Sequence, residues 1–243
     1  QNGHPESAFR QTALATLILR QFPDAVTSLK FEINEVWLAC GYGDGMIRVY
    51  DTNSDILEGE FNKVQTTIWN YDPMETKFPV TNMVWMLSRV AKFDAYRTKT
   101  LVTSTGDGHV RGWDLNSKER KPLFDIDQSK HGGTYGLDIH NGTKMLATGG
   151  SDFVLRIYDL NEEPYKVCAS LKHSHENEPA HFNRIFSVKF DPNEPNIVYS
   201  GGWDKIVSMF DLRANRPICH ISGPYISGDT LDYKNGLLLA GSY

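Results

Sequence analysis

One short block recurs four times along the chain, and this repetition constrains the fold more than any other feature of the sequence. Each copy consists of an Asp in a turn, five strand-like residues, an aromatic residue and a second Asp. The two Asp residues are seven positions apart in every copy. The copies lie at residues 44–51, 107–114, 152–159 and 204–211. Four copies in register indicate a repeat architecture built from similar supersecondary units.

The residues around each block predict four short antiparallel strands per repeat. A β-like run ending in small residues precedes the block, as at 145–150, and an alternating run precedes that, as at 185–190. We expect a shorter fourth strand after each block, at 56–61, 122–126, 166–171 and 217–221. Because one such sheet cannot bury both of its faces, the repeats should stack radially around an axis. The copies begin 63, 45 and 52 residues apart, which indicates loops inserted between blades of about 40–45 residues.

The turn Gly106-Asp107-Gly108, followed by a strand ending in Trp113-Asp114, resembles the repeat of the WD-repeat family. The other copies end in aromatic variants of that pair, Tyr50-Asp51, Tyr158-Asp159 and Phe210-Asp211. The resemblance covers Pro23 to Tyr243. It implies an all-β WD-repeat β-propeller, seven-bladed when complete, and a protein that holds other proteins rather than catalysing a reaction.

The resemblance also implies a structural hydrogen-bond network in each blade. The network joins a His before the first strand, a Ser or Thr in the second, the turn Asp, and the Trp of the third. The matching positions are His181, Ser200 and Asp204 with Phe210; His131, Thr148 and Asp152 with Tyr158; and Thr103, Asp107 and Trp113, where Thr76 stands in place of the His. The first repeat departs at Phe22 and Cys40. We therefore expect the first two repeats to depend more on apolar packing.

We expect these units to form a single propeller domain over residues 1–243, supplying about four and a half blades. The expected blades are 24–62, 80–127, 131–172 and 181–222, followed by a partial blade at 228–243. Residues 12–22 resemble the strand with which WD-repeat propellers close their last blade. The blade to which this strand would belong is not found in the sequence, so we expect the chain to be the N-terminal part of a larger ring.

Composition argues against several classes of partner. The formal net charge of -5 gives no reason to expect direct binding to nucleic acid, which relies on clustered Lys and Arg. No apolar run approaches the ~18 residues that span a bilayer, so we expect no membrane association. Cys40, Cys168 and Cys219 form no C-x-x-C pair and lie in apolar strand-like runs. They predict buried, reduced thiols in a cytoplasmic or nuclear protein.

The sequence shows no constellation of catalytic, cofactor-binding or metal-ligating residues. The serine hydrolase elbow, the zinc metalloprotease motif, the P-loop and the kinase signatures are all missing. The Gly-rich turns at 41–45 and 106–108 repeat at the blade turn, so they indicate hairpins rather than phosphate cradles. The group His173, His175, Glu176 and His181 could begin a metal site, but the blade network already explains His181 and a polar inserted loop explains the rest. We therefore predict a non-enzyme without cofactor or metal.

Three insertions break the blade period and are candidates for partner binding. They lie at 62–79, 87–99 and 172–184, and they carry Trp69 and Tyr71 in the first and Phe93, Tyr96 and Arg97 in the second. Aromatic and Arg side chains on loops are typical of binding hot spots. An equally good interpretation is that the aromatics pin their own loops to the blade. The first and third insertions should share a rim with the turn Asp residues, which favours a partner of basic character.

A fourth motif, Phe210-Asp211-Leu212-Arg213, resembles the W-D-x-R box of WD-repeat substrate receptors of cullin-4 ubiquitin ligases. In the alternative interpretation, Arg213 is simply solvated or paired in a turn. The leading prediction is a protein–protein interaction scaffold that binds one or more proteins, within a larger multiprotein complex, through its rim loops. The alternatives are a ubiquitin-ligase substrate receptor and a component of a ribonucleoprotein or chromatin complex.

Overall fold

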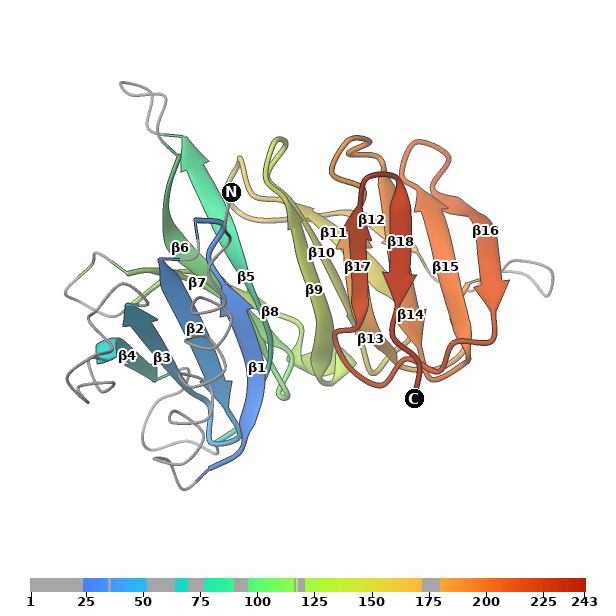
Figure 1. The fold of residues 1–243 in the computed structure, drawn as a ribbon. Coiled ribbons are helices and arrows are strands. Elements are labelled where there is room, and N and C mark those ends of the chain that lie inside the picture. The colour runs from blue at the N-terminus through green and yellow to red at the C-terminus, as the bar shows by residue number, and fades with distance from the viewer. Residues whose placement is uncertain are drawn as a thin grey trace, which may run out of the picture. The chain divides into compact units, whose positions relative to one another are not determined.

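The computed structural model describes residues 24–34, 36–51, 64–69, 77–89, 96–115, 117, 121–171 and 180–243. Within these ranges the side chains at 64–66, 69, 88–89 and 96–99 are outside the description. The coloured ribbon of Figure 1 shows antiparallel strands throughout. The chain divides into two compact units at Val80, and each is described by itself.

The first unit is one four-stranded antiparallel sheet in the order β1-β2-β3-β4. Its strands are β1 (Val26–Phe31), β2 (Trp37–Tyr42), β3 (Met46–Asp51) and β4 (Val64–Trp69). The core of this sheet is built from alternate positions of β2 and β3, because successive strand residues point to opposite faces. Its buried members are Leu38, Cys40, Tyr42, Met46 and Tyr50.

The second unit contains three further four-stranded sheets and a two-stranded one. The sheets comprise β5 (Val80–Arg89), β6 (Tyr96–Thr105), β7 (His109–Asp114) and β8 (Pro122–Asp127); β9 (Thr134–His140), β10 (Met145–Gly150), β11 (Leu155–Asp159) and β12 (Val167–Leu171); β13 (Ile185–Phe190), β14 (Ile197–Gly202), β15 (Ile206–Asp211) and β16 (Arg216–Ser222); and β17 (Leu231–Lys234) with β18 (Leu237–Ala240). We call the four-stranded sheets blades 1 to 4 in chain order.

The turn Asp explains why the repeated block folds locally in the same way four times. In each blade its carboxylate accepts a hydrogen bond from the backbone N–H two residues later, which is an Asx turn. The donors are the N–H groups of Met46, His109, Val154 and Ile206, at 3.0, 3.2, 3.4 and 3.2 Å. Each bond fixes the reversal between the second and third strands of its blade.

The first strands of successive blades contact one another within the second unit, as Figure 1 shows for β9, β13 and β17. Side chains bond across these contacts to the neighbouring backbone. Asp138 on β9 accepts from the N–H of Phe190 at 2.8 Å, and Ser187 on β13 accepts from the N–H of Leu231 at 3.1 Å. Buried apolar side chains of β10–β15 form one cluster that joins blades 3 and 4. This is the mutual burial that stacked blades require.

Two expectations about blade boundaries are wrong. The fourth strand of blade 1 is β4, at 64–69, because Met46 and Ile47 of β3 pair with Trp69 and Ile68. The extra residues therefore lie inside blade 1, and Trp69 belongs to a strand rather than to a loop. In blade 2, β5 runs to Arg89 and β6 starts at Tyr96, so much of the expected loop at 87–99 continues the strand ladder.

The predicted closure strand at 12–22 and the metal-site candidates at 173–176 lie outside the described residues. The seven-bladed ring and the single domain over 1–243 stay predictions.

Candidate interaction surface

Blade 4 holds the most complete version of the predicted polar network. The His181 ring lies between two partners, with Nδ1 2.7 Å from Asp204 Oδ2 and Nε2 2.7 Å from Ser200 Oγ. The side chains of His181 and Asp204 are 0% exposed. The same carboxylate accepts the backbone N–H of Phe182 at 3.1 Å. The network thus ties the approach to β13, strand β14 and the turn before β15 into one buried unit.

In blade 3 the polar side chains have different hydrogen-bond partners from those expected. His131 Nδ1 lies 3.4 Å from Asp152 Oδ2, but the Thr148 hydroxyl bonds to Gln128, at 3.2 Å from Nε2. Arg156 donates to the carboxylate of the turn residue Asp152, with Nη1 3.2 Å from Oδ1. Burial and the Arg156 charge lower the pKa of His131. Gln128 therefore occupies the inner position that the sequence assigned to the His.

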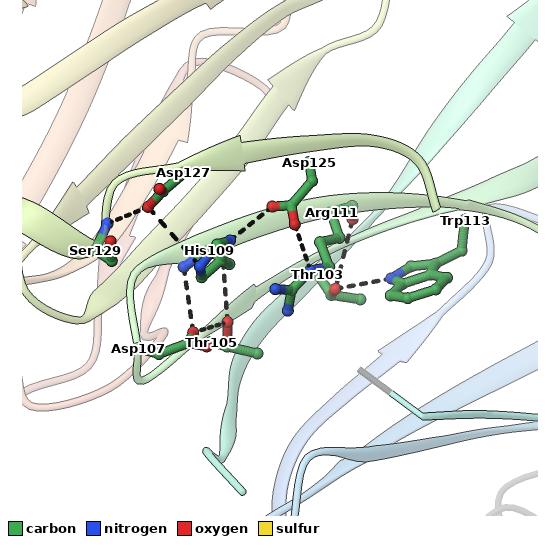
Figure 2. A network of polar contacts seen from close by, with 9 residues as sticks. All are labelled: Thr103, Thr105, Asp107, His109, Arg111, Trp113, Asp125, Asp127 and Ser129. Carbon is green, nitrogen blue, oxygen red and sulfur yellow. Dashed lines mark hydrogen bonds and ion pairs between the residues drawn. The ribbon is translucent and has the colours of Figure 1, made fainter. Parts of the chain in front are cut away.

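Blade 2 keeps the Trp bond but separates it from the turn, as Figure 2 shows. Trp113 Nε1 donates to Thr103 Oγ1 at 3.0 Å within the buried part of the sheet. The Asp107 carboxylate instead accepts from the Thr105 hydroxyl and from the N–H of His109. Sequence reasoning missed Thr105, which lies two residues before the Asp in the position of an Asx-turn partner.

The third and fourth strands of blade 2 carry a half-exposed polar ladder (Figure 2). Asp125 on β8 pairs with His109 Nδ1 at 2.8 Å and with Arg111 Nε at 2.9 Å. Asp127 lies 3.8 Å from His109 Nε2 and accepts the N–H of Ser129 at 2.8 Å. Opposite charges facing each other across two strands stabilise the pairing. These contacts therefore give the cluster a structural role, which is to stabilise the pairing of β7 with β8.

Blade 1 replaces the network with buried aromatic and thiol groups. Cys40 stands at the Ser/Thr position and is 0% exposed. Burial raises the pKa of its thiol to about 12, so it stays protonated at neutral pH. The hydroxyl groups of Tyr42 and Tyr50 lie 3.4 Å apart inside the same sheet. In contrast to the expectation for all three thiols, Cys168 and Cys219 are exposed, because they lie on the outer strands β12 and β16.

A groove of about 440 Å³ lies between β8 and the strands β11 and β12. Phe124 and Tyr165 meet edge to face in its wall, with ring centroids 5.1 Å apart. Its buried cation, Arg156, is paired with Asp152. The groove therefore offers apolar contact and hydrogen-bonding groups but no uncompensated buried charge.

The predicted partner-binding residues of the first two insertions lie at strand ends or outside the described residues. Trp69 lies at the end of β4, and Tyr96 and Arg97 lie at the start of β6, with their side chains outside the description. Tyr71 and Phe93 lie outside the described residues altogether.

Arg213 follows β15, and its side chain turns back to bond to Asp211 of the same motif. Its Nε and Nη2 donate to the two oxygens of Asp211 at 3.0 and 2.8 Å, while its side chain stays 62% exposed. Hydrogen bonding from Arg213 lowers the pKa of Asp211 to about 2.

The three turn acids of the second unit are engaged by neighbouring groups of their own blades. Asp204 is buried against His181, Asp152 is paired with Arg156, and Asp107 is bonded to Thr105. Their carboxylates serve the turns, because a buried or half-buried carboxylate needs donors of its own. Several large apolar residues are exposed, notably Phe182, which is 62% exposed. No group of three or more metal-ligating side chains occurs in the described ranges, and no helix there is long and apolar enough to cross a membrane.

Comparison with known proteins agrees with this architecture. The family model described as "WD domain, G-beta repeat" matches residues 16–51, 122–159 and 172–211. WD repeat-containing protein 91 of Pongo abelii is 26% identical over 171 residues, covering 69% of this chain and 22% of that protein. Target of rapamycin complex 1 subunit mip1 of Schizosaccharomyces pombe is 21% identical over 179 residues, covering 73% of this chain and 12% of that protein.

The chain therefore spans about a fifth or less of the length of these two relatives. A chain in a structure described as "Crystal Structure of Mitotic Checkpoint Complex" superposes with a TM-score of 0.60 at 17% identity, over 82% of this chain and 53% of that chain, which shows a shared fold. WD-repeat proteins generally act as scaffolds for other proteins. The repeated Asp turns, the four-stranded blades and the three matched repeats together show that this chain belongs to the WD-repeat β-propeller family.

Proposed function

We propose that this chain is a non-catalytic scaffold that binds partner proteins through side chains at the ends of its blade strands. The observation that carries the proposal is the exposed Phe182 side chain just before the first strand of blade 4. Asp204 fixes the backbone of Phe182, yet Phe182 is 62% exposed. A rigid backbone that holds an apolar ring in water suits a hot spot, because a partner would remove that ring from water.

The experiment is affinity purification of the tagged chain from its own cells after mild crosslinking, with mass spectrometry of the retained proteins. We expect one or more proteins to be retained in stoichiometric amounts, and Phe182→Ser to release at least one of them. Val167→Ser is the matched control, because Val167 is also an exposed apolar residue but lies on the outer strand β12. Retention of no protein by the unaltered chain, or equal loss with both variants, would contradict the proposal.

A cullin-4 substrate receptor is the second candidate, and the geometry of Arg213 favours it. The two bonds to Asp211 hold the guanidinium in a defined position while leaving it exposed. A bidentate pair presents a cation with little loss of side-chain entropy on binding. Arg213→Ala should abolish co-purification with the ligase adaptor, whereas Arg216→Ala, at a second exposed Arg of the same blade, should not. Unchanged co-purification with Arg213→Ala would eliminate this candidate.

We also propose a cytoplasmic or nuclear location. The three cysteines are free thiols, which suits a reducing compartment. Imaging of the fluorescently tagged chain tests the location directly.

A further inference from the structure

Four aromatic side chains from separate parts of the second unit form one continuous row. The Tyr135 and Phe186 rings stack with centroids 5.0 Å apart, Phe186 and Trp203 lie 4.9 Å apart, and Trp203 and Tyr225 lie 6.4 Å apart with nearly parallel planes. We call these residues the aromatic row. All four side chains are partly exposed, so the row reaches the surface, while Phe186 also packs against the buried cluster of Val207, Ile226 and Leu231.

The fold does not require large side chains at the middle of this row. In blades 1, 3 and 4 the residue before the turn Asp donates its N–H to the backbone carbonyl of the residue that precedes the first strand. That bond joins Gly43 to Ala25 in blade 1, Ser151 to Gly133 in blade 3, and Trp203 to Arg184 in blade 4. Small residues make the same backbone bond in blades 1 and 3. The Trp and Arg of blade 4 are therefore free of a role in the turn itself.

Arg184 gives the aromatic row a positive charge. Its Cζ lies 5.2 Å from the centroid of the Trp203 ring, a cation–π arrangement that orients the guanidinium over the row. Arg184 is exposed, and within the described ranges no carboxylate forms an ion pair with it. The exposed Lys205, two residues beyond Trp203, likewise has no carboxylate partner there.

The acids closest to the row in sequence are already engaged. Asp204 is buried on His181, and Asp229 accepts from the Ser187 hydroxyl at 3.0 Å. Within the described ranges, Arg184 and Lys205 are therefore exposed cations beside the row that no ion pair balances. A basic partner would meet unpaired cations there, and like charges brought together cost binding free energy.

Trp203 adds a donor that the fold leaves unused. Its Nε1 is buried and has no hydrogen-bond partner in the structure. A buried donor without an acceptor destabilises the folded state. An acceptor from a bound partner would recover that free energy after a small movement of the covering atoms.

We propose that the aromatic row and Arg184 bind an acidic peptide segment of a partner protein. A carboxylate of the peptide pairs with the Arg184 guanidinium, and a neighbouring apolar or aromatic side chain packs on Phe186 and Trp203. This inference rests on the proposed scaffold function, and it names the chemistry of the partner.

The test measures fluorescence anisotropy of a short labelled peptide of alternating Glu and Phe, titrated with the purified chain. We expect saturable binding that weakens as salt rises, and no binding by the matched peptide of alternating Lys and Phe. Arg184→Glu should weaken binding at least about tenfold, because an attraction becomes a repulsion. Arg216→Glu carries the same charge change at the opposite end of blade 4 and should leave the affinity within about twofold.

Trp203→Ser, which introduces the residue found at this position in blade 3, separates aromatic packing from charge. We expect it to weaken binding at least about tenfold with an unchanged circular dichroism spectrum, since Ser151 occupies the same turn in blade 3. Three results would each overturn the inference: no binding of the acidic peptide, equal binding of the basic peptide, or equal affinity of the Arg184→Glu variant. If partners are still retained from cells in that event, the scaffold function stands and only the acidic-peptide inference fails.

Discussion

Blades 2 and 4 carry the same sequence block but distribute their polar groups differently. In blade 4 the turn Asp is buried, and His181 links it to Ser200 through two bonds of 2.7 Å. In blade 2 the Asp107 carboxylate bonds, among the described residues, within its own turn, and a separate Trp113–Thr103 bond stabilises the inner sheet. The feature that both blades share is therefore the Asx bond, in which the turn Asp accepts the backbone N–H two residues later. The remaining network is one of several ways to satisfy buried polar groups.

The largest expected effect tests the buried network of blade 4. His181→Ala removes two bonds and leaves the Ser200 hydroxyl without its partner and the buried Asp204 with fewer donors. We expect a loss of about 3–5 kcal/mol in the free energy of unfolding, measured by urea denaturation. Ser200→Ala should cost about 1 kcal/mol. A loss of under about 1 kcal/mol for His181→Ala would mean that blade 4 is no more dependent on its network than blade 2.

Blade 3 lies between these two cases and tests which residue holds the inner position. Gln128→Ala leaves the buried Thr148 hydroxyl unsatisfied, so we expect a loss of about 1–3 kcal/mol. His131→Ala removes a half-exposed contact at 3.4 Å and should cost at most about 0.5 kcal/mol. The same denaturation assay applies. The reverse ranking would restore His131 to the role that the sequence assigned to it.

A smaller effect is expected in blade 2. Trp113→Phe removes the Nε1 bond to Thr103 but keeps an aromatic ring, as Phe210 does in blade 4. The Thr103 hydroxyl keeps the Arg111 carbonyl at 3.5 Å, so we expect a loss of about 1 kcal/mol. Thermal unfolding monitored by circular dichroism gives the comparison with His181→Ala. A larger loss of stability for Trp113→Phe than for His181→Ala would mean that blade 2 depends more on its polar bonds than blade 4 does.

The smallest effect concerns the exposed Asp211–Arg213 pair at the end of β15. Because Arg213 lowers the Asp211 pKa from 3.8 to about 2, the pair stabilises the folded state above pH ~4, and its contribution is lost as pH falls through about 2. Arg213→Ala should return the midpoint toward 3.8, as measured by carboxyl chemical shifts in an NMR titration. An unchanged midpoint would show that the pair does not persist in solution. At neutral pH the variant should have little effect on stability, because the pair is exposed.

Local signals made the second and third strands of every blade predictable. The Asp turn acts within three residues, and its consequence is the same wherever it occurs. The fourth strand of blade 1 escaped prediction because an outer strand has only one paired edge and a weak apolar pattern. Both 56–61 and 64–69 satisfy that pattern, and the pairing of Met46 with Trp69 decided between them.

The sequence predicted which residue types form the polar network, but it predicted only some of the pairs that bond to each other. His181, Ser200 and Asp204 meet as their positions suggested, whereas Thr148 meets Gln128 rather than His131. The difference arises in the 3-10 turn Ser129–His131, which places the His131 ring near solvent and the Gln128 amide in the interior. A change of a few residues in a turn redirects a side chain without altering the strand pattern.

By itself the sequence determined the repeat and the strand reversals, because each reversal depends on contacts within a few residues. Since this local pattern occurs four times, it also indicated the family. The tertiary structure alone decided which partners the turn acids take and that Tyr135, Phe186, Trp203 and Tyr225 form one row. Those residues lie up to 90 positions apart. No local pattern connects them, since their contact depends on how one blade packs against the next.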